Sequence, residues 1–159
     1  MKIHYFEIKQ KLPVDLPTAW EFFSSPKNLN AITPEDMNFK IVSGAESRAY
    51  AGQIITYRVS PMWGIILNWV TEISQCVEGK YFIDEQRFGP YKFWHHQHHF
   101  EETADGVIMT DILHYALPFG WLGELLGNLF IHRKVQHIFD FREKKLLHIF
   151  IDGSKSILA

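Results

Sequence analysis

The sequence is short of cysteine, since Cys76 is the only one among 159 residues. A single thiol cannot form an internal disulfide, so a disulfide framework is excluded. Residues 1–5 also lack the charged and then apolar pattern of a signal peptide. We therefore expect a cytoplasmic protein whose fold rests on a packed core, which a chain of this length can form.

The sequence also lacks a large net charge and long apolar stretches. The formal net charge is −2 at pH 7, and the 16 basic and 18 acidic residues are mixed along the chain, which leaves no basic patch for nucleic acid. The longest apolar stretches, residues 61–70 and 116–131, are too short or are interrupted by polar side chains, so neither predicts a membrane span. We expect a soluble protein with no transmembrane segment and no nucleic-acid partner, either a monomer or a weak dimer.

Aromatic side chains are abundant instead. They make up 15% of the sequence and include 13 phenylalanines and 5 tryptophans. This is more than a domain of this size needs for packing alone. Aromatic rings can close a core or line a pocket for a hydrophobic molecule, and composition leaves both interpretations open.

The N-terminal passage predicts a strand followed by two short helices. Residues 2–12 alternate in polarity and stop at a proline, as a strand does. Asp15 is a candidate N-cap for a short helix around residues 19–23. A second short helix, residues 26–31, should end before Thr33, because the residue preceding a proline avoids helical geometry.

From Met37 on, short stretches rich in β-branched and aromatic residues are separated by turns. They predict six further strands, over residues 39–42, 52–60, 65–76, 80–88, 91–101 and 107–117. After Pro118, apolar residues recur at helical spacing to about Phe150, which predicts one long helix. We expect a single domain, residues 1–151, and a flexible C-terminal tail, residues 152–159.

This order of elements predicts an α+β fold. Seven antiparallel strands would form a curved sheet wrapped around the long C-terminal helix, with the two short helices placed after the first strand. Such a sheet can leave a cavity between its concave face and the helix.

The likeness to a known family rests on three stretches: LPVDLPTAWEFFSSPKNLNAITP (12–34), DEQRFGPYKFWHHQHHF (84–100) and MTDILHYALPFGWLG (109–123). They resemble the bacterial ligand-binding proteins of the START-like, or SRPBCC, superfamily. The resemblance implies the helix-grip fold and covers nearly the whole chain. It leaves the function open, because this superfamily includes lipid-transfer domains, hormone receptors and polyketide aromatase/cyclases on one scaffold.

The strand over residues 91–101 carries four histidines within five positions. Successive side chains on a strand point to opposite faces. One face would therefore hold Trp94, His96, His98 and Phe100, and the other would hold Phe93, His95, Gln97 and His99. The apolar ends of the first set predict that it faces the cavity, so we expect no chemical role for His95 and His99.

The turns also predict a register for the neighbouring strands. If residues 89–91 form the first hairpin loop, Asp84 lies opposite His96, and if residues 103–106 form the second, His98 lies opposite Asp111. With Gln86, these side chains would form one inward polar patch: Asp84, Gln86, His96, His98 and Asp111.

Three interpretations of this patch are open. It is a buried polar network, which can also form the polar end of a ligand pocket. It is an acid–base centre in which His96 or His98 works with Asp111. It is a zinc or iron site. The third is the least favoured, because hydrogen bonding explains the histidine–aspartate pairs equally well, and we expect neither a metal nor another cofactor.

The face assignments also predict the walls of the cavity. The residues expected to line it are Tyr57, Trp69, Phe82, Trp94, Phe100 and Tyr115 from the sheet and Leu122, Leu125 and Leu129 from the last helix. By contrast, His132, Arg133 and Lys134 are expected on the solvated face of that helix.

The preferred hypothesis for function is a carrier or sensor that binds a small hydrophobic molecule, lipid-like or polyketide-like, without catalysis. The alternative is a cofactor-independent cyclase or dehydratase, as the resemblance implies for some relatives. A third hypothesis is an interaction or stress-related module whose cavity is vestigial. A core filled without a cavity would exclude the first two hypotheses.

Overall fold

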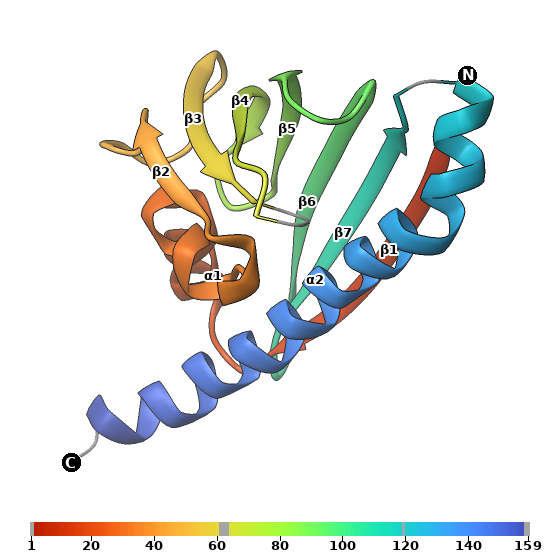
Figure 1. Cartoon of the computed structure of the whole chain (residues 1–159). Helices are drawn as coiled ribbons and strands as arrows, with labels where there is room; N and C mark the ends of the chain where they lie inside the picture. The colour runs from red at the N-terminus through yellow and green to blue at the C-terminus, as the bar shows by residue number, and fades with distance from the viewer. Residues whose placement is uncertain (1, 61–63, 119, 158–159) are drawn as a thin grey trace.

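A curved antiparallel sheet of seven strands forms the frame of the structure (Figure 1). The computed structural model describes residues 2–60, 64–118 and 120–157, and for residues 120–130 and 152–157 it describes the backbone alone. The strands are β1 (His4–Leu12), β2 (Lys40–Ser43), β3 (Gln53–Val59), β4 (Leu67–Val77), β5 (Tyr81–Phe88), β6 (Phe93–Thr103) and β7 (Gly106–Ala116). Their order is β1-β7-β6-β5-β4-β3-β2, so strands two to seven form a meander and β1 closes it beside β7.

The helices lie where local signals place them. Helix α1 (Leu16–Ser24) begins after Asp15, whose carboxylate accepts a hydrogen bond of 2.8 Å from the backbone N–H of Thr18, as an N-cap does. Two 3₁₀ helices follow, η1 (Pro26–Ile32) and η2 (Glu35–Met37). The second short helix expected from the sequence is therefore present, but as the tighter 3₁₀ form.

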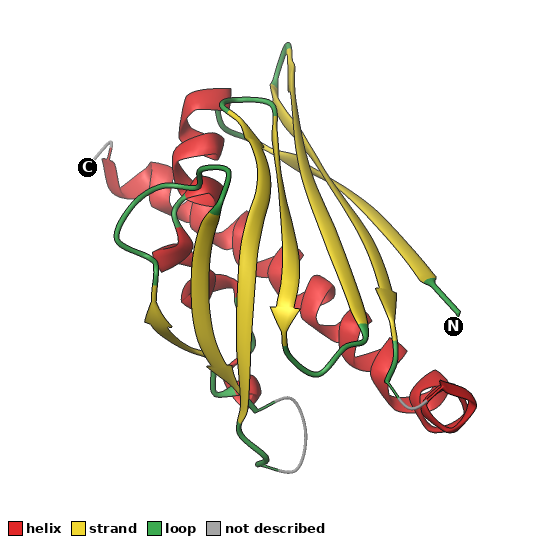
Figure 2. Cartoon of the chain, turned by 90° about the horizontal axis from the view of Figure 1, so that it is seen from above, coloured by secondary structure: helices red, strands yellow, loops and turns green. Residues whose placement is uncertain are grey.

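The long helix α2 (Gly120–Ile157) runs along the concave face of the sheet (Figure 2). It continues to Ile157 and so takes in most of the segment expected as a tail. Among the described residues, none of the helices combines the length and the hydropathy needed to cross a bilayer.

Two groups of buried side chains hold the layers together. One joins α1 and the end of α2 to the middle of the sheet, through contacts such as Trp20 with Phe82 and Phe100. The other joins β7 to the middle of α2 and includes Leu113, Val135 and Phe139. The α+β helix-grip architecture expected from the sequence is confirmed.

Candidate functional site

The polar residues at the centre of the concave face come from three adjacent strands. Asp84 lies on β5 opposite His96 on β6, and His98 on β6 lies opposite Asp111 on β7. The register predicted from the two turns is confirmed. Since alternate residues of β6 share a face, both histidines project toward α2 between the two carboxylates.

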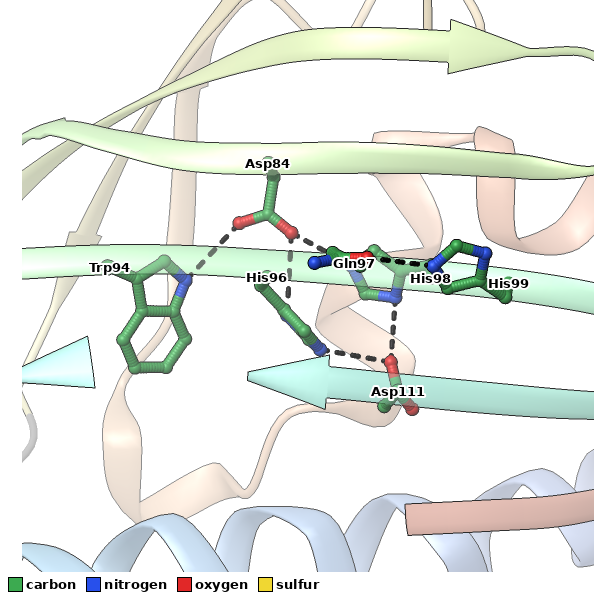
Figure 3. A network of polar contacts seen from close by, with 7 residues as sticks. All are labelled: Asp84, Trp94, His96, Gln97, His98, His99 and Asp111. Atoms are coloured by element: carbon green, nitrogen blue, oxygen red, sulfur yellow. Dashed lines mark hydrogen bonds and ion pairs between the residues drawn. The ribbon is translucent and has the colours of Figure 1, made fainter. Parts of the chain in front are cut away.

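These four residues, here called the tetrad, contact one another across and along the strands (Figure 3). His96 lies 3.0 Å from Asp111 through Nε2 and 3.4 Å from Asp84 through Nδ1. His98 lies 2.8 Å from Asp84 through Nε2 and 2.8 Å from Asp111 through Nδ1. The contact between His98 Nδ1 and Asp111 does not have hydrogen-bond geometry, so it is an electrostatic contact. Each histidine therefore touches both carboxylates.

The tetrad is well shielded from water. His96, His98 and Asp111 are at most 7% exposed. Asp84 is the most accessible member, and its second carboxylate oxygen accepts a hydrogen bond of 3.3 Å from the indole N–H of Trp94. On the other side, the ring of Phe82 stacks on His98 at 4.3 Å between centroids. The aromatic side chains of Trp94 and Phe82 thus flank the tetrad on two sides.

Burial and pairing shift the pKa values of the tetrad in opposite directions. Burial alone would lower the pKa of His96, but its hydrogen bonds to Asp111 and Asp84 outweigh that effect and raise the pKa to about 9. For Asp84 and Asp111, burial would raise the pKa, while hydrogen bonds and charge interactions with the two histidines hold it far below the usual range. At neutral pH the tetrad therefore contains two ionised carboxylates and a protonated His96.

Three side chains of the tetrad are also of the types that bind metal ions. Asp84, His96 and His98 each offer a ligand atom, and these atoms all lie within 4.8 Å of one another. A metal ion would require neutral imidazoles. Since the carboxylates hold a proton on His96 at neutral pH, a metal would have to displace that proton and break the existing hydrogen bonds.

A cavity of about 600 Å³ lies in front of the tetrad, between the sheet, the η1–η2 passage and α2. This is many times the roughly 30 Å³ that one water molecule occupies in the liquid, so the core is not filled. Seven of the residues predicted for the site line it: Tyr57, Trp69, Phe82, Asp84, Trp94, His96 and His98.

The remaining predicted residues lie elsewhere. Gln86 bonds both backbone groups of Tyr91, at 2.6 and 3.2 Å, and so closes the loop between β5 and β6. Phe100 packs against Trp20 and Phe23 in the core. Tyr115 is buried beside Trp94, and its hydroxyl contacts His132.

Asp111 contacts both histidines from the neighbouring strand β7 and is not among the described residues that line the cavity. The predicted lining residues Leu122, Leu125 and Leu129 lie outside the described side chains. They stay predictions.

Sequence reasoning missed two of the walls. The passage from α1 to η2 supplies Phe22, Phe23, Leu29, Ile32 and Met37, and α2 supplies Ile131, Lys134, Ile138 and Arg142. The helix residues recur at intervals of three and four, a signal that the polar character of Lys134 and Arg142 concealed.

The expectation that Lys134 lies on the solvated face was therefore wrong. Its ammonium group is paired with Asp36 at the edge of the cavity. The long stem of a lysine can cover apolar surface while its charged end reaches a partner.

The outward histidines of β6 are separate from this site. His95 lies 2.8 Å from a carboxylate oxygen of Glu85, and His99 lies 2.9 Å from the amide oxygen of Gln97. The four-histidine run thus belongs to two faces, as strand alternation predicts.

No protein-family model matches the chain, and no curated protein matches it. Solved structures do match. TTHA0849 from Thermus thermophilus is 15% identical with a TM-score of 0.74, over 95% of this chain and 99% of that chain. The Zhui aromatase/cyclase from Streptomyces sp. R1128 is 11% identical with a TM-score of 0.72, over 92% of each chain. Ara h 8.0201 is 14% identical with a TM-score of 0.61, over 92% of this chain and 99% of that chain. At such identities the likeness establishes the fold, and it is the helix-grip fold that the sequence resemblance implied.

Proposed function

We propose that the protein binds a small hydrophobic molecule in the cavity between the sheet and α2, as a carrier or sensor without catalysis. The observation that carries this proposal is the cavity of about 600 Å³ with mainly apolar walls and one polar patch. Ligand pockets in proteins have volumes of roughly 300–1,000 Å³ and combine apolar walls with a few polar groups that orient the ligand.

The bonding of the tetrad favours binding over catalysis. All four imidazole nitrogens lie within 3.4 Å of a carboxylate oxygen. A general acid or base needs a nitrogen within hydrogen-bond reach of its substrate. In the tetrad each nitrogen faces a carboxylate, and Nδ1 of His98, which makes no hydrogen bond among the described residues, is buried, so we infer that the network serves as a polar wall for a ligand.

A cofactor-independent cyclase or dehydratase is the second candidate. It is favoured by one observation: both histidines line the cavity and are held by carboxylates, with the pKa of His96 raised to about 9. A structural neighbour is an aromatase/cyclase, which is consistent with this candidate. Turnover of a polyketide-type substrate by the native protein, lost in His98→Gln while the substrate still binds, would favour the enzyme over the carrier.

Cavity-filling substitutions on β3 test the binding proposal. Ile55 and Val59 face the cavity, whereas Ile54 and Arg58 on the same strand face outward and are exposed. We expect the neutral fluorophore N-phenyl-1-naphthylamine to bind the native protein with enhanced emission. The double variant Ile55→Trp, Val59→Trp should lose most of this binding, because the added rings occupy the cavity.

The outward variant Ile54→Trp, Arg58→Trp is the matched control and should bind the fluorophore as the native protein does. Fluorescence titration measures all three proteins. Equal affinity in the inward and outward variants would show that the fluorophore binds outside the cavity and would count against the proposal.

A further inference from the structure

A single positive charge on α2 stands apart from the other charges of the cavity. Three ordinarily charged residues other than histidine line it among the described residues: Asp84, Lys134 and Arg142. Asp84 is neutralised within the tetrad, and Lys134 is paired with Asp36. In the described part of the chain, Arg142 forms no ion pair with a carboxylate.

The Nε–H donor of the Arg142 guanidinium group lacks a hydrogen-bond acceptor among the described residues. This Nε–H group is buried. The contact that the structure records for the guanidinium is with the ring of Phe139, 5.3 Å from the centroid. A ring face attracts a cation but does not take the place of a hydrogen-bond acceptor. A buried donor without an acceptor destabilises a protein, more so when it is charged.

Arg142 also lies on the helix face that the cavity touches. Ile131, Lys134, Ile138 and Arg142 follow one another at intervals of three, four and four residues, so they form one stripe along α2. At 1.5 Å per residue, Arg142 is roughly 12 Å along the helix from Lys134. The paired lysine and the unpaired arginine are therefore separate features of the same wall, with Ile138 between them.

We infer that the ligand is an amphiphile with an anionic head group, and that Arg142 binds this group. A carboxylate matches the planar fork of a guanidinium, which can donate two parallel hydrogen bonds to its two oxygens. The apolar part of the molecule then occupies the cavity beside the aromatic wall of the sheet. This inference rests on the proposed binding function and specifies the chemical class of the ligand.

Matched alkyl compounds test the inference. Dodecanoate, dodecanol and dodecyltrimethylammonium share a chain length and differ in the charge of the head group. Displacement of N-phenyl-1-naphthylamine measures their affinities. The native protein should bind dodecanoate most tightly and dodecyltrimethylammonium most weakly. Native protein that binds the cation as tightly as the carboxylate overturns the inference, and this comparison needs no variant.

Arg142→Gln should lower the affinity for dodecanoate roughly 10- to 100-fold, the range for hydrogen bonds to a charged group. The affinity for dodecanol should not change. Arg133→Gln is the matched control, because Arg133 is an exposed arginine on the same helix, and it should behave as the native protein does. A similar loss for dodecanoate and dodecanol in Arg142→Gln, or no loss for either, overturns the inference.

The outcomes separate this inference from the function on which it rests. If the fluorophore and all three alkyl compounds fail to bind, the proposed function fails with the inference. If dodecanol binds as tightly as dodecanoate to the native protein and to Arg142→Gln, the binding function stands and the anionic head group is refuted.

Discussion

The chemistry of the sheet wall is decided by buried histidines and carboxylates that contact one another. Two carboxylates and two imidazoles meet at distances of 2.8 to 3.4 Å. Removing one partner of a buried ion pair costs about 3–5 kcal/mol, because the other charge is left without compensation. Each member of the tetrad therefore depends on the others, and their protonation is linked to the stability of the fold.

The free energy of unfolding should accordingly fall between pH 6 and pH 9. Because the pKa of His96 is raised from 6.5 to about 9 in the folded state, its stabilising contribution is complete below pH 6.5 and is lost as the pH rises through 9. A shift of this size corresponds to roughly 3 kcal/mol. Asp84 and Asp111 have lowered pKa values, so their contribution is present above about pH 4 and is lost on acidification. Urea unfolding at pH 6 and pH 9 measures the difference.

Two histidine variants identify the source of this pH dependence. His96→Gln should be less stable at pH 6 and should show a much smaller change between the two pH values. His137→Gln is the control, since His137 is exposed on α2, and it should keep the native pH dependence. A native protein equally stable at pH 6 and pH 9 would refute the assignment.

At the scale of the elements, the strands and their register were predictable from the sequence. The way in which the helices cover the concave face of the sheet was not. Two turns predicted that Asp84 pairs with His96 and His98 with Asp111, because a strand has only two faces and a hairpin loop sets its register. The sequence could not indicate which parts of the shared face other elements would cover. Phe100 has the same orientation as His98 but lies under α1, against Trp20.

The wall formed by α2 was missed for a related reason. A helix that lines a cavity can present charged residues inward if they find partners or face a ligand, so polarity alone misplaced Lys134. The partner of this lysine, Asp36, is distant in sequence, and only the folded chain brings the two together. The 3₁₀ helices η1 and η2 close the cavity on the side of Asp36. The spacing of their apolar residues in the sequence does not distinguish core residues from residues that line a cavity.

The turn between β6 and β7 should be sensitive to a single methyl group. Gly106 has a φ of 137°, and a Cβ placed there would lie 2.2 Å from the carbonyl oxygen of Leu12 at the end of β1. Gly106→Ala should lower the free energy of unfolding by more than backbone strain alone, which is on the order of 1–3 kcal/mol. The loss arises because the turn and β1 cannot both keep their positions.

Gly52→Ala is the comparison for this turn. Gly52 also has a positive φ, 91°, but an added Cβ would meet nothing within 4 Å. This variant should show the strain without the overlap. Urea unfolding of the two variants ranks them, and a Gly106→Ala protein as stable as Gly52→Ala would show that the close approach to Leu12 has no energetic effect.

On the scale of the whole molecule, the sheet, the N-terminal passage and α2 enclose one space and give it different chemistry. The sheet contributes aromatic rings and the tetrad, the N-terminal passage contributes apolar side chains, and α2 contributes Arg142. A cavity of about 600 Å³ in a chain of 159 residues leaves contacts unmade that a filled core would have. A ligand that fills it would restore those contacts and stabilise the folded state.

Native mass spectrometry after incubation with an organic extract of the expression cells tests the binding of a hydrophobic molecule most directly. The native protein should carry one small molecule per chain, which denaturing extraction then releases for identification. The inward variant Ile55→Trp, Val59→Trp should show the mass of the bare chain, and the outward variant Ile54→Trp, Arg58→Trp should keep the bound molecule. A bare native chain, or the same bound molecule in both variants, would contradict the account.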